Sequence, residues 1–220
     1  MLATLHDDTG DVAVAGLVRR TDADASALDY PAERFAAEAG LVDGVCMVGS
    51  GRLVDRLWSH PAISVLGIDA PPAGGAPNAL VPSARAKVSL RIAPGDTSAS
   101  AYAALGAHLR RYAPWGADVA VTLESGGEPC VIDATGGAYD AVRAAFTEAW
   151  DGVEPVDIGV GASIPFIATF QQLFPKAAIL VTGVEDPQSR AHSPNESLHL
   201  GEFARACLAE ALLLAKLAAG

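Results

Sequence analysis

The feature that most constrains the fold is a strictly alternating segment, residues 84–92, with the sequence ARAKVSLRI. Its even positions hold alanine, valine, leucine and isoleucine, and its odd positions hold arginine, lysine and serine. Such alternation predicts a β-strand with one packed side and one solvent-facing side. Residues 62–68, rich in β-branched side chains, predict another strand, and the proline- and glycine-rich residues 69–78 predict a loop between the two.

A helix and a further strand are predicted to follow. Residues 99–112 carry apolar side chains along one side of a helix, and Thr97 or Ser98 can cap its N-terminus. Residues 117–123 predict the next strand. The order strand, strand, helix, strand describes three-quarters of a split β-α-β sandwich, an antiparallel sheet backed by helices. The missing quarter is expected upstream of Leu2.

The other segments predict mainly helices. Periodicity and capping residues indicate helices over residues 31–39, 139–150, 166–174 and 200–217. The apolar run at 177–181 (AAILV) predicts a strand that is covered on both faces. Residues 10–60 are interpreted as containing an insertion. Its glycines lack the lysine and serine or threonine of a phosphate-binding loop, so no ligand is assigned to it.

Composition and charge exclude several classes of function. The chain has 220 residues, of which 50% are hydrophobic, and a formal net charge of -11. Nucleic acids and anionic membrane surfaces require a cationic footprint, so neither is an expected partner. The three cysteines are odd in number and widely spaced, which indicates no disulfide framework and favours the cytoplasm. No apolar run approaches the length that spans a bilayer.

The loop after the strand at 177–181 holds the main candidate for function. It comprises residues 183–196 (GVEDPQSRAHSPNE). Taken alone, His192 would be a solvated histidine, with Asn195 or Ser197 capping the last helix. The phrase AHSPNE, however, closely resembles the AH(A/S)PNE signature of the zinc aminopeptidase, carnosinase and aminoacylase family, whose members hydrolyse dipeptides and N-acyl amino acids. The resemblance implies that His192 is a ligand of one of two metal ions.

The resemblance extends over residues 64–95, which are similar to the family's lid, or dimerisation, domain. It implies that Arg91 grips the C-terminal carboxylate of the substrate, a task that suits a planar guanidinium. Without the resemblance, Arg91 would be interpreted as a solvated residue on the solvent-facing side of its strand. The carnosinase-like branch also uses a polar residue shortly before the proline that opens this strand, supplied by the partner subunit. Asn78 is the candidate for that position, and Ala79 is the alternative.

Residues 159–165 (GVGASIP) resemble the EGGSIP turn of the same family. The resemblance implies that Gly161 and Ser163 bind substrate near its carboxylate, because small residues let backbone amides approach a ligand. Val160 stands where a family glutamate can occur, and Ala162 replaces the second glycine. The alternative is a turn that only joins a strand to a helix. Ser163 is not favoured as a nucleophile, since no Gly-x-Ser-x-Gly elbow surrounds it.

His6 and Asp8 share the His-x-Asp spacing of the family's first metal ligands. In the family that pair follows a buried strand, whereas here it lies beside the turn-forming sequence DDTG. We therefore interpret His6 as a cation at the end of a short helix rather than as a metal ligand.

The resulting prediction is a fold of α/β and α+β class. An incomplete ferredoxin-like lid domain, lacking its first strand, is expected over residues 1–130, and the C-terminal part of an α/β zinc-peptidase catalytic domain over residues 131–220. The resemblance implies a homodimeric hydrolase of dipeptides or N-acyl amino acids that activates water with two zinc ions, or with cobalt or manganese. No Glu-Glu pair or bridging aspartate is found, so this chain alone is expected to be inactive. The alternative is a non-catalytic dimerisation or ligand-binding module derived from the same family.

Overall fold

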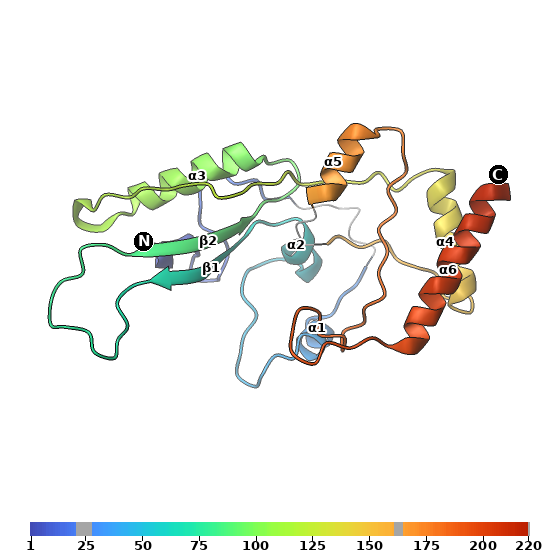
Figure 1. Ribbon diagram of the computed structural model, residues 1–220, viewed down its shortest axis with the longest axis horizontal. Helices are drawn as coiled ribbons and strands as arrows, with labels where there is room; N and C mark the ends of the chain where they lie inside the picture. The colour runs from blue at the N-terminus through green and yellow to red at the C-terminus, as the bar shows by residue number, and fades with distance from the viewer. Residues whose placement is uncertain (21–27, 161–164, 220) are drawn as a thin grey trace. The chain divides into compact units, whose positions relative to one another are not determined.

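The computed structural model describes residues 1–20, 28–160 and 165–219 (Figure 1). The chain forms two compact units, which are described separately. The first comprises Met1–Ser26, Cys46–Pro129 and Gly159–Pro165, and the second Ala27–Val45, Cys130–Ile158 and Phe166–Gly220. The predicted division into residues 1–130 and 131–220 stays a prediction. No helix among the described residues is long and apolar enough to cross a membrane.

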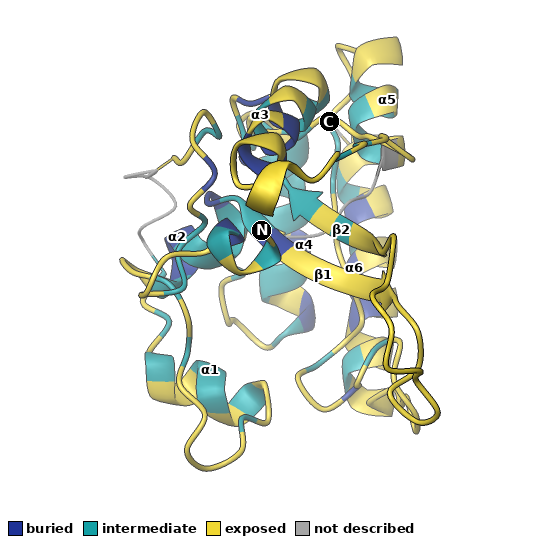
Figure 2. Ribbon diagram, turned by 90° about the vertical axis from the view of Figure 1, so that its left-hand side faces the viewer, coloured by how far each residue is buried: buried dark blue, intermediate teal, exposed yellow. Residues whose placement is uncertain are grey.

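The first unit is built on an antiparallel hairpin. Strand β1 (Ala62–Asp69) pairs with β2 (Arg85–Arg91), and the register runs from Ala62 opposite Arg91 to Asp69 opposite Arg85. A bulge lies between Val65 and Gly67. The predicted strands at 62–68 and 84–92 are therefore confirmed to within one residue at each end. Most of β1 is exposed (Figure 2), so the hairpin packs mainly through the residues near the β1 start and the β2 end.

Helix α3 (Ser98–Arg111) covers the hairpin and completes the core of the first unit. The prediction that Thr97 or Ser98 caps this helix is confirmed for Thr97, whose Oγ1 accepts a 3.1 Å hydrogen bond from the Ser100 backbone N–H. The core consists of five buried apolar residues contributed by the N-terminal segment, β1 and α3: Leu5, Val14, Ile63, Leu105 and Leu109.

The strand predicted at residues 117–123 does not form a ladder in the structure. Val119 and Val121 nevertheless pack against the core, and the Tyr102 hydroxyl donates a 2.8 Å hydrogen bond to the Val121 carbonyl. Val119 and Val121 are only partly buried and Leu123 is 49% exposed, and among the described residues a helix side chain, rather than a neighbouring strand, bonds the Val121 carbonyl. The periodicity of the sequence shows which side chains are packed and cannot show which groups bond the backbone.

Short helices occupy the segment interpreted as an insertion and the chain start. They are η1 (Leu2–Leu5), α1 (Ala32–Glu38) and α2 (Leu53–Trp58), and a further short helix, η3 (Pro114–Gly116), follows α3. Helix α1 agrees with the predicted helix at 31–39 and ends before Gly40, whose φ of 65° suits glycine.

The second unit contains a pair of packed helices, α4 (Gly137–Ala149) and α6 (Leu200–Ala219), and a shorter helix, α5 (Pro165–Leu173). Small residues, Ala145 and Ala149 of α4 and Ala206 and Ala209 of α6, are buried and allow close approach of the two helices. Lys216 of α6 forms a 2.9 Å ion pair with Glu148. In the described part of this unit, α6 packs on helix α4.

Candidate functional site

The loop that carries His192 is organised around one buried hydroxyl. Ser189 is 2% exposed, and its Oγ accepts a 2.9 Å hydrogen bond from the Asp186 backbone N–H. The Ser189 carbonyl accepts a 3.0 Å bond from the Ser197 backbone N–H, which joins the two ends of the loop. Residues 186–197 therefore form a closed loop in which a serine replaces the regular hydrogen bonds of a helix or a strand.

His192 lies on the exposed part of this loop. Its φ is 62°, in the left-handed region that non-glycine residues rarely adopt, and Arg190 and Asn195 have similar values of 53° and 61°. The carboxylate of Glu196 accepts a 3.2 Å hydrogen bond from the His192 backbone N–H. Left-handed residues cost free energy and persist only where surrounding bonds hold them, and this pattern is common at functional sites. Glu196, the last residue of the AHSPNE phrase, thus braces the residue predicted to bind metal.

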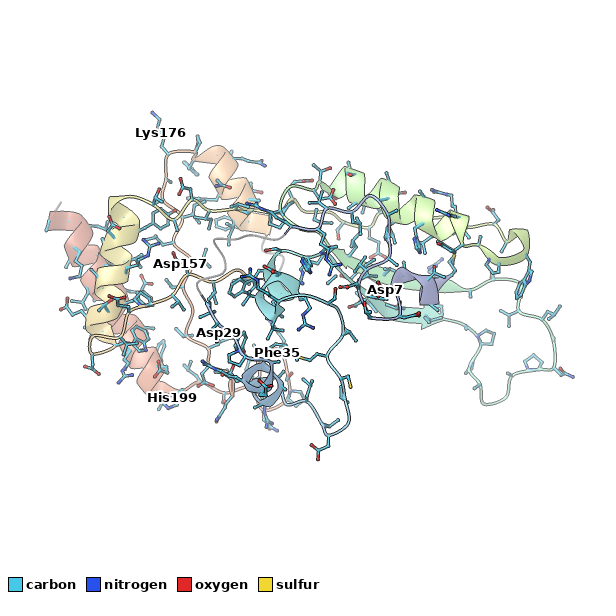
Figure 3. All side chains as sticks on the ribbon, turned by 180° about the vertical axis from the view of Figure 1, so that it is seen from behind. Asp7, Asp29, Phe35, Asp157, Lys176 and His199 are labelled. Carbon is cyan, nitrogen blue, oxygen red and sulfur yellow. The ribbon has the colours of Figure 1, made fainter. Side chains whose placement is uncertain are left out.

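The capping prediction for the last helix needs correction. The residue before α6 that bonds its first turn is His199, whose Nδ1 accepts a 3.1 Å hydrogen bond from the Glu202 backbone N–H. Asn195 and Ser197 were the predicted caps, but Ser197 closes the loop through its backbone instead. Figure 3 labels His199 at the beginning of this helix. Histidine is an uncommon N-cap, so sequence preference pointed to the more usual residue types.

A complete metal site is not formed by the described residues. Across residues 1–20, 28–160 and 165–219, no group of three histidine, cysteine, aspartate or glutamate side chains could hold an ion. Catalytic zinc sites use three protein ligands, so the donor set here does not fit zinc by itself. His192 can supply one imidazole, and the remaining ligands of any such site would have to come from elsewhere.

Arg91 occupies the end of β2, in the first unit, and is half-buried. One guanidinium nitrogen, Nη2, donates a 3.2 Å hydrogen bond to the Arg56 carbonyl near the C-terminus of α2. Burial lowers the pKa of Arg91 from its ordinary value. Arg91 is therefore not a fully solvated residue on the outer side of its strand, because its side chain is half-buried and one guanidinium nitrogen is bonded to the end of α2.

The other predicted substrate contacts lie on exposed chain or outside the described residues. Asn78 and Ala79 are both exposed in the loop between β1 and β2, and the choice between them stays open. Gly161 and Ser163 fall outside the described residues. Arg91 and Asn78 belong to the first unit and His192 to the second, each of which is described by itself.

His6 precedes a tight turn and Asp8 lies within it. The Asp7 carboxylate accepts hydrogen bonds from the backbone N–H groups of Thr9 and Asp11, at 2.9 and 3.0 Å. His6 pairs through its backbone with Val12. Both His6 and Asp8 are exposed, and they are not part of a metal-binding group among the described residues.

A cluster of charged and polar side chains in the first unit could not be recognised from the sequence. The Asp11 carboxylate accepts hydrogen bonds from Arg19 Nη2 and from the backbone and hydroxyl of Ser50. Arg19 Nε lies 3.3 Å from Nδ1 of the buried His60. Burial, and secondly the charge of Arg19, lower the pKa of His60, so its neutral form is favoured.

A second ion pair lies at the N-terminus of helix α2. Arg52 forms two hydrogen bonds of 2.9 and 2.8 Å to the carboxylate of Asp55, which is 2% exposed. Hydrogen bonding to Arg52 is the main cause that lowers the pKa of Asp55. The spacing of three residues between them was the sequence signal that could have revealed this pair. Because α2 provides the carbonyl that bonds Arg91, the ion pair also helps to define the surroundings of that guanidinium.

Comparison with known proteins places this chain among metallopeptidases. Residues 8–216 match the model of Peptidase family M20/M25/M40. A cysteinylglycine-S-conjugate dipeptidase from Corynebacterium striatum is 32% identical over 187 residues, which cover 84% of this chain and 41% of that protein.

Solved structures show the same fold at lower sequence identity. The di-peptidase Dug1p from Saccharomyces cerevisiae superposes with a TM-score of 0.80 and 21% identity over 100% of this chain and 47% of its own. Human carnosine dipeptidase 1 superposes with a TM-score of 0.75 and 20% sequence identity, over 100% of this chain and 48% of its own. The M20 family metallo-carboxypeptidase Sso-CP2 from Sulfolobus solfataricus superposes with a TM-score of 0.78 and 20% sequence identity, over 97% of this chain and 50% of its own.

The chain spans about half the length of these relatives. The predicted α/β and α+β fold class and the resemblance to a metallopeptidase family are both confirmed. With a family match over nearly its whole length, the chain belongs to Peptidase family M20/M25/M40.

Proposed function

We propose that this chain is part of a metal-dependent hydrolase that cleaves dipeptides or N-acyl amino acids, and that His192 is one ligand of its metal centre. The observation that carries the proposal is the AHSPNE loop, which presents an exposed imidazole on a backbone braced by Ser189 and Glu196. The dipeptidase activities named for three of the relatives support a dipeptide substrate. Zinc is the proposed metal, with cobalt or manganese as substitutes.

Within this proposal, Arg91 binds the C-terminal carboxylate of the substrate. Its guanidinium is partly desolvated and anchored to the end of α2, so less side-chain freedom would be lost when a carboxylate binds. Asn78, Gly161 and Ser163 are proposed as further substrate contacts. Homodimerisation through residues 1–130 and a cytoplasmic location complete the proposal.

The described residues do not supply the donor set of a catalytic zinc, so no step of hydrolysis is assigned to them. We therefore expect the purified 220-residue chain to show no turnover of a dipeptide panel in the presence of zinc, cobalt or manganese. Release of amino acids from the panel would be measured by chromatography. Turnover by the chain alone would contradict the proposal that the remaining ligands lie elsewhere.

The ligand role of His192 can be tested separately from turnover. Added Mn²⁺ should broaden the NMR signals of the His192 imidazole at lower concentration than those of the exposed His6. The His192→Ala variant should lose this preferential binding, whereas the matched His6→Ala variant should keep it. Equal broadening of both histidines would contradict a metal-ligand role for His192.

A second candidate is a non-catalytic ligand-binding or dimerisation module derived from the same family. It is favoured by the absence of a three-ligand group in the described part of the chain, combined with an anchored Arg91. Such a module would bind dipeptides without metal, with an affinity that falls on Arg91→Lys substitution. Calorimetric titration in the presence of a chelator distinguishes the two candidates, since the hydrolase fragment should bind dipeptide at most weakly there.

A further inference from the structure

Helix α2 contacts two parts of the first unit that are proposed to bind the substrate near its carboxylate. The Arg56 carbonyl, near the end of α2, accepts a 3.2 Å hydrogen bond from Arg91 Nη2. Trp58, the last residue of α2, packs against Gly159, the first residue of the GVGASIP segment. Both contacts lie within the first unit, which includes Gly159–Pro165. One short helix therefore connects the guanidinium with the start of that segment.

The contact between Trp58 and Gly159 leaves no room for a side chain. A Cβ at Gly159 would lie 2.5 Å from the Trp58 Cγ and 2.6 Å from the Trp58 Cβ. Carbon atoms that are not bonded to each other normally lie about 3.5–4.0 Å apart. The φ of Gly159 is outside the positive range that favours glycine, so the indole, rather than the backbone conformation, requires glycine here.

Helix α2 is itself held firmly beside the end of β2. Its ion pair with the buried Asp55 fastens its first turn, and the Asp55 carbonyl accepts 2.9 Å bonds from the backbone N–H groups of Ser59 and His60. The chain then enters β1 at Ala62, which pairs with Arg91 in the ladder. The position of α2 relative to Arg91 is thus defined both by the ladder and by the guanidinium.

We propose that Trp58 is a positioning residue for the substrate carboxylate, because it fixes the separation between the Arg91 guanidinium and the segment that begins at Gly159. This inference rests on the proposed function, in which Arg91 and that segment bind the substrate near its C-terminal carboxylate. Trp58 acts through Gly159 and α2 and does not bond the substrate. Groups held at a fixed separation lose less freedom when a ligand binds between them. The insertion within residues 10–60, to which the sequence assigned no ligand, thereby contributes to the site.

The experiment follows carboxylate binding by the full chain through the NMR signal of the Arg91 Nε–H. The probe is N-acetylglycine, and N-acetylglycinamide, which lacks the carboxylate, is its control. The acid should shift the Arg91 signal of the original chain, and the amide should not. Trp58→Ala should weaken binding of the acid by at least about fivefold, because the separation is no longer fixed. Trp58→Phe keeps an aromatic ring against Gly159 and should retain affinity within about twofold.

Substitution of Gly159 tests the same contact from its other side. Gly159→Ala places a methyl group against the indole and should also weaken binding by at least about fivefold. In the Trp58→Ala chain that methyl group has room, so the double variant should bind at most about twofold more weakly than Trp58→Ala alone. Gly127→Ala is the matched control, because a Cβ there has nothing within 4 Å, and it should retain affinity within about twofold.

The titration observes folded molecules, so a loss of stability alone leaves the measured affinity unchanged. The methyl signals of the core residues Leu105 and Leu109 should be the same in every variant. Should Trp58→Ala fail to fold, the comparison of Gly159→Ala with Gly127→Ala decides instead, and equal affinities of those two overturn the proposal.

Two further results would overturn the positioning role of Trp58. One is a Trp58→Ala chain that binds N-acetylglycine as tightly as the original chain. The other is full additivity of the Trp58→Ala and Gly159→Ala losses, since the two residues would then act independently. If the original chain shows no shift of the Arg91 signal, the carboxylate role of Arg91 fails and this proposal fails with it. Binding that does not depend on Trp58 overturns this proposal alone.

Discussion

A single carboxylate, that of Asp11, connects three parts of the first unit that are distant in sequence. It bonds Arg19 and Ser50 and belongs to the turn that begins at Asp7. Burial, the largest single influence, raises the pKa of Asp11, but the hydrogen bonds from Ser50 and Arg19 together outweigh it and place the pKa well below its ordinary value. Asp11 is therefore charged over the whole range in which most proteins are folded.

The depressed pKa predicts how stability depends on pH. The stabilisation from Asp11 is complete above the ordinary carboxyl pKa of about 3.9 and is lost as pH falls toward the folded-state pKa. We expect Asp11→Asn to lower the free energy of unfolding by about 2 kcal/mol at pH 7, and the difference from the original chain to narrow below about pH 4. Urea unfolding at several pH values measures this. The exposed Asp8→Asn is the control, and a pH-independent difference would contradict the prediction.

Gly10 illustrates a backbone requirement at the same turn. Its φ is 85°, and a Cβ placed there would lie 2.6 Å from the Val48 Cβ. We expect Gly10→Ala to destabilise the chain by at least about 1–2 kcal/mol, because both left-handed strain and a steric clash are introduced. Gly74→Ala, where nothing lies within 4 Å, should be nearly neutral in the same urea titration. Equal effects of the two substitutions would show that the turn does not require glycine.

At the scale of the element, α3 depends on a cap that the sequence predicts. Thr97 Oγ1 accepts the Ser100 N–H at the start of this helix of 14 residues. Thr97→Ala should cost about 1 kcal/mol, since a backbone donor loses its partner, and Thr97→Ser should restore most of that loss. Ser100→Ala is a suitable control because Ser100 contributes only its backbone to this bond. Thermal unfolding measures the differences, and no rescue by serine would contradict the cap.

The loop at 186–197 is an element without regular secondary structure. Its stability depends on Ser189 and Glu196, which bond the backbones of Asp186 and His192. Such side-chain bonds replace the repeating backbone bonds of helices and strands. A functional residue held this way keeps a defined position while staying exposed, which is the arrangement expected of a ligand-binding loop on a scaffold.

At the scale of the whole molecule, the two units differ in how complete their described cores are. The core of the first unit gathers Leu5, Val14 and Ile63 around Leu105 and Leu109 of α3. In the second unit, α4 and α6 pack through small residues, while Leu214 on α6 and Phe166 on α5 stay 68% exposed.

The core of the first unit can be tested directly. Leu105→Ala should lower the free energy of unfolding by about 2–5 kcal/mol, because it removes buried methyl groups and leaves a cavity. Leu80→Ala is the matched control, since Leu80 is 99% exposed and the change should stay within about 0.5 kcal/mol. Urea unfolding followed by circular dichroism gives both values. A small effect of Leu105→Ala would contradict its place in the core.

Local patterns in the sequence determined the elements of this protein that depend on nearby residues. The alternation at 84–92 predicted β2, the β-branched run predicted β1, and the periodicities and caps predicted α1, α3, α4, α5 and α6 with small errors at their ends. The AHSPNE phrase led to the family, which the match over residues 8–216 confirmed. These features can be predicted because helix and strand periodicity and capping bonds involve residues only a few positions apart.

Only the tertiary structure decided which groups bond across long distances in the chain. The Asp11 carboxylate accepts a hydrogen bond from Ser50, which lies 39 residues away in the sequence. The Tyr102 hydroxyl donates one to the Val121 carbonyl, which lies 19 residues away. The segments at 117–123 and 177–181 have the composition of strands, but in the described structure the side chains of Tyr102 and Tyr139, rather than strands, bond their backbones. A strand pattern records the local preferences of side chains, whereas a ladder requires a neighbouring strand, and its presence depends on the surrounding fold.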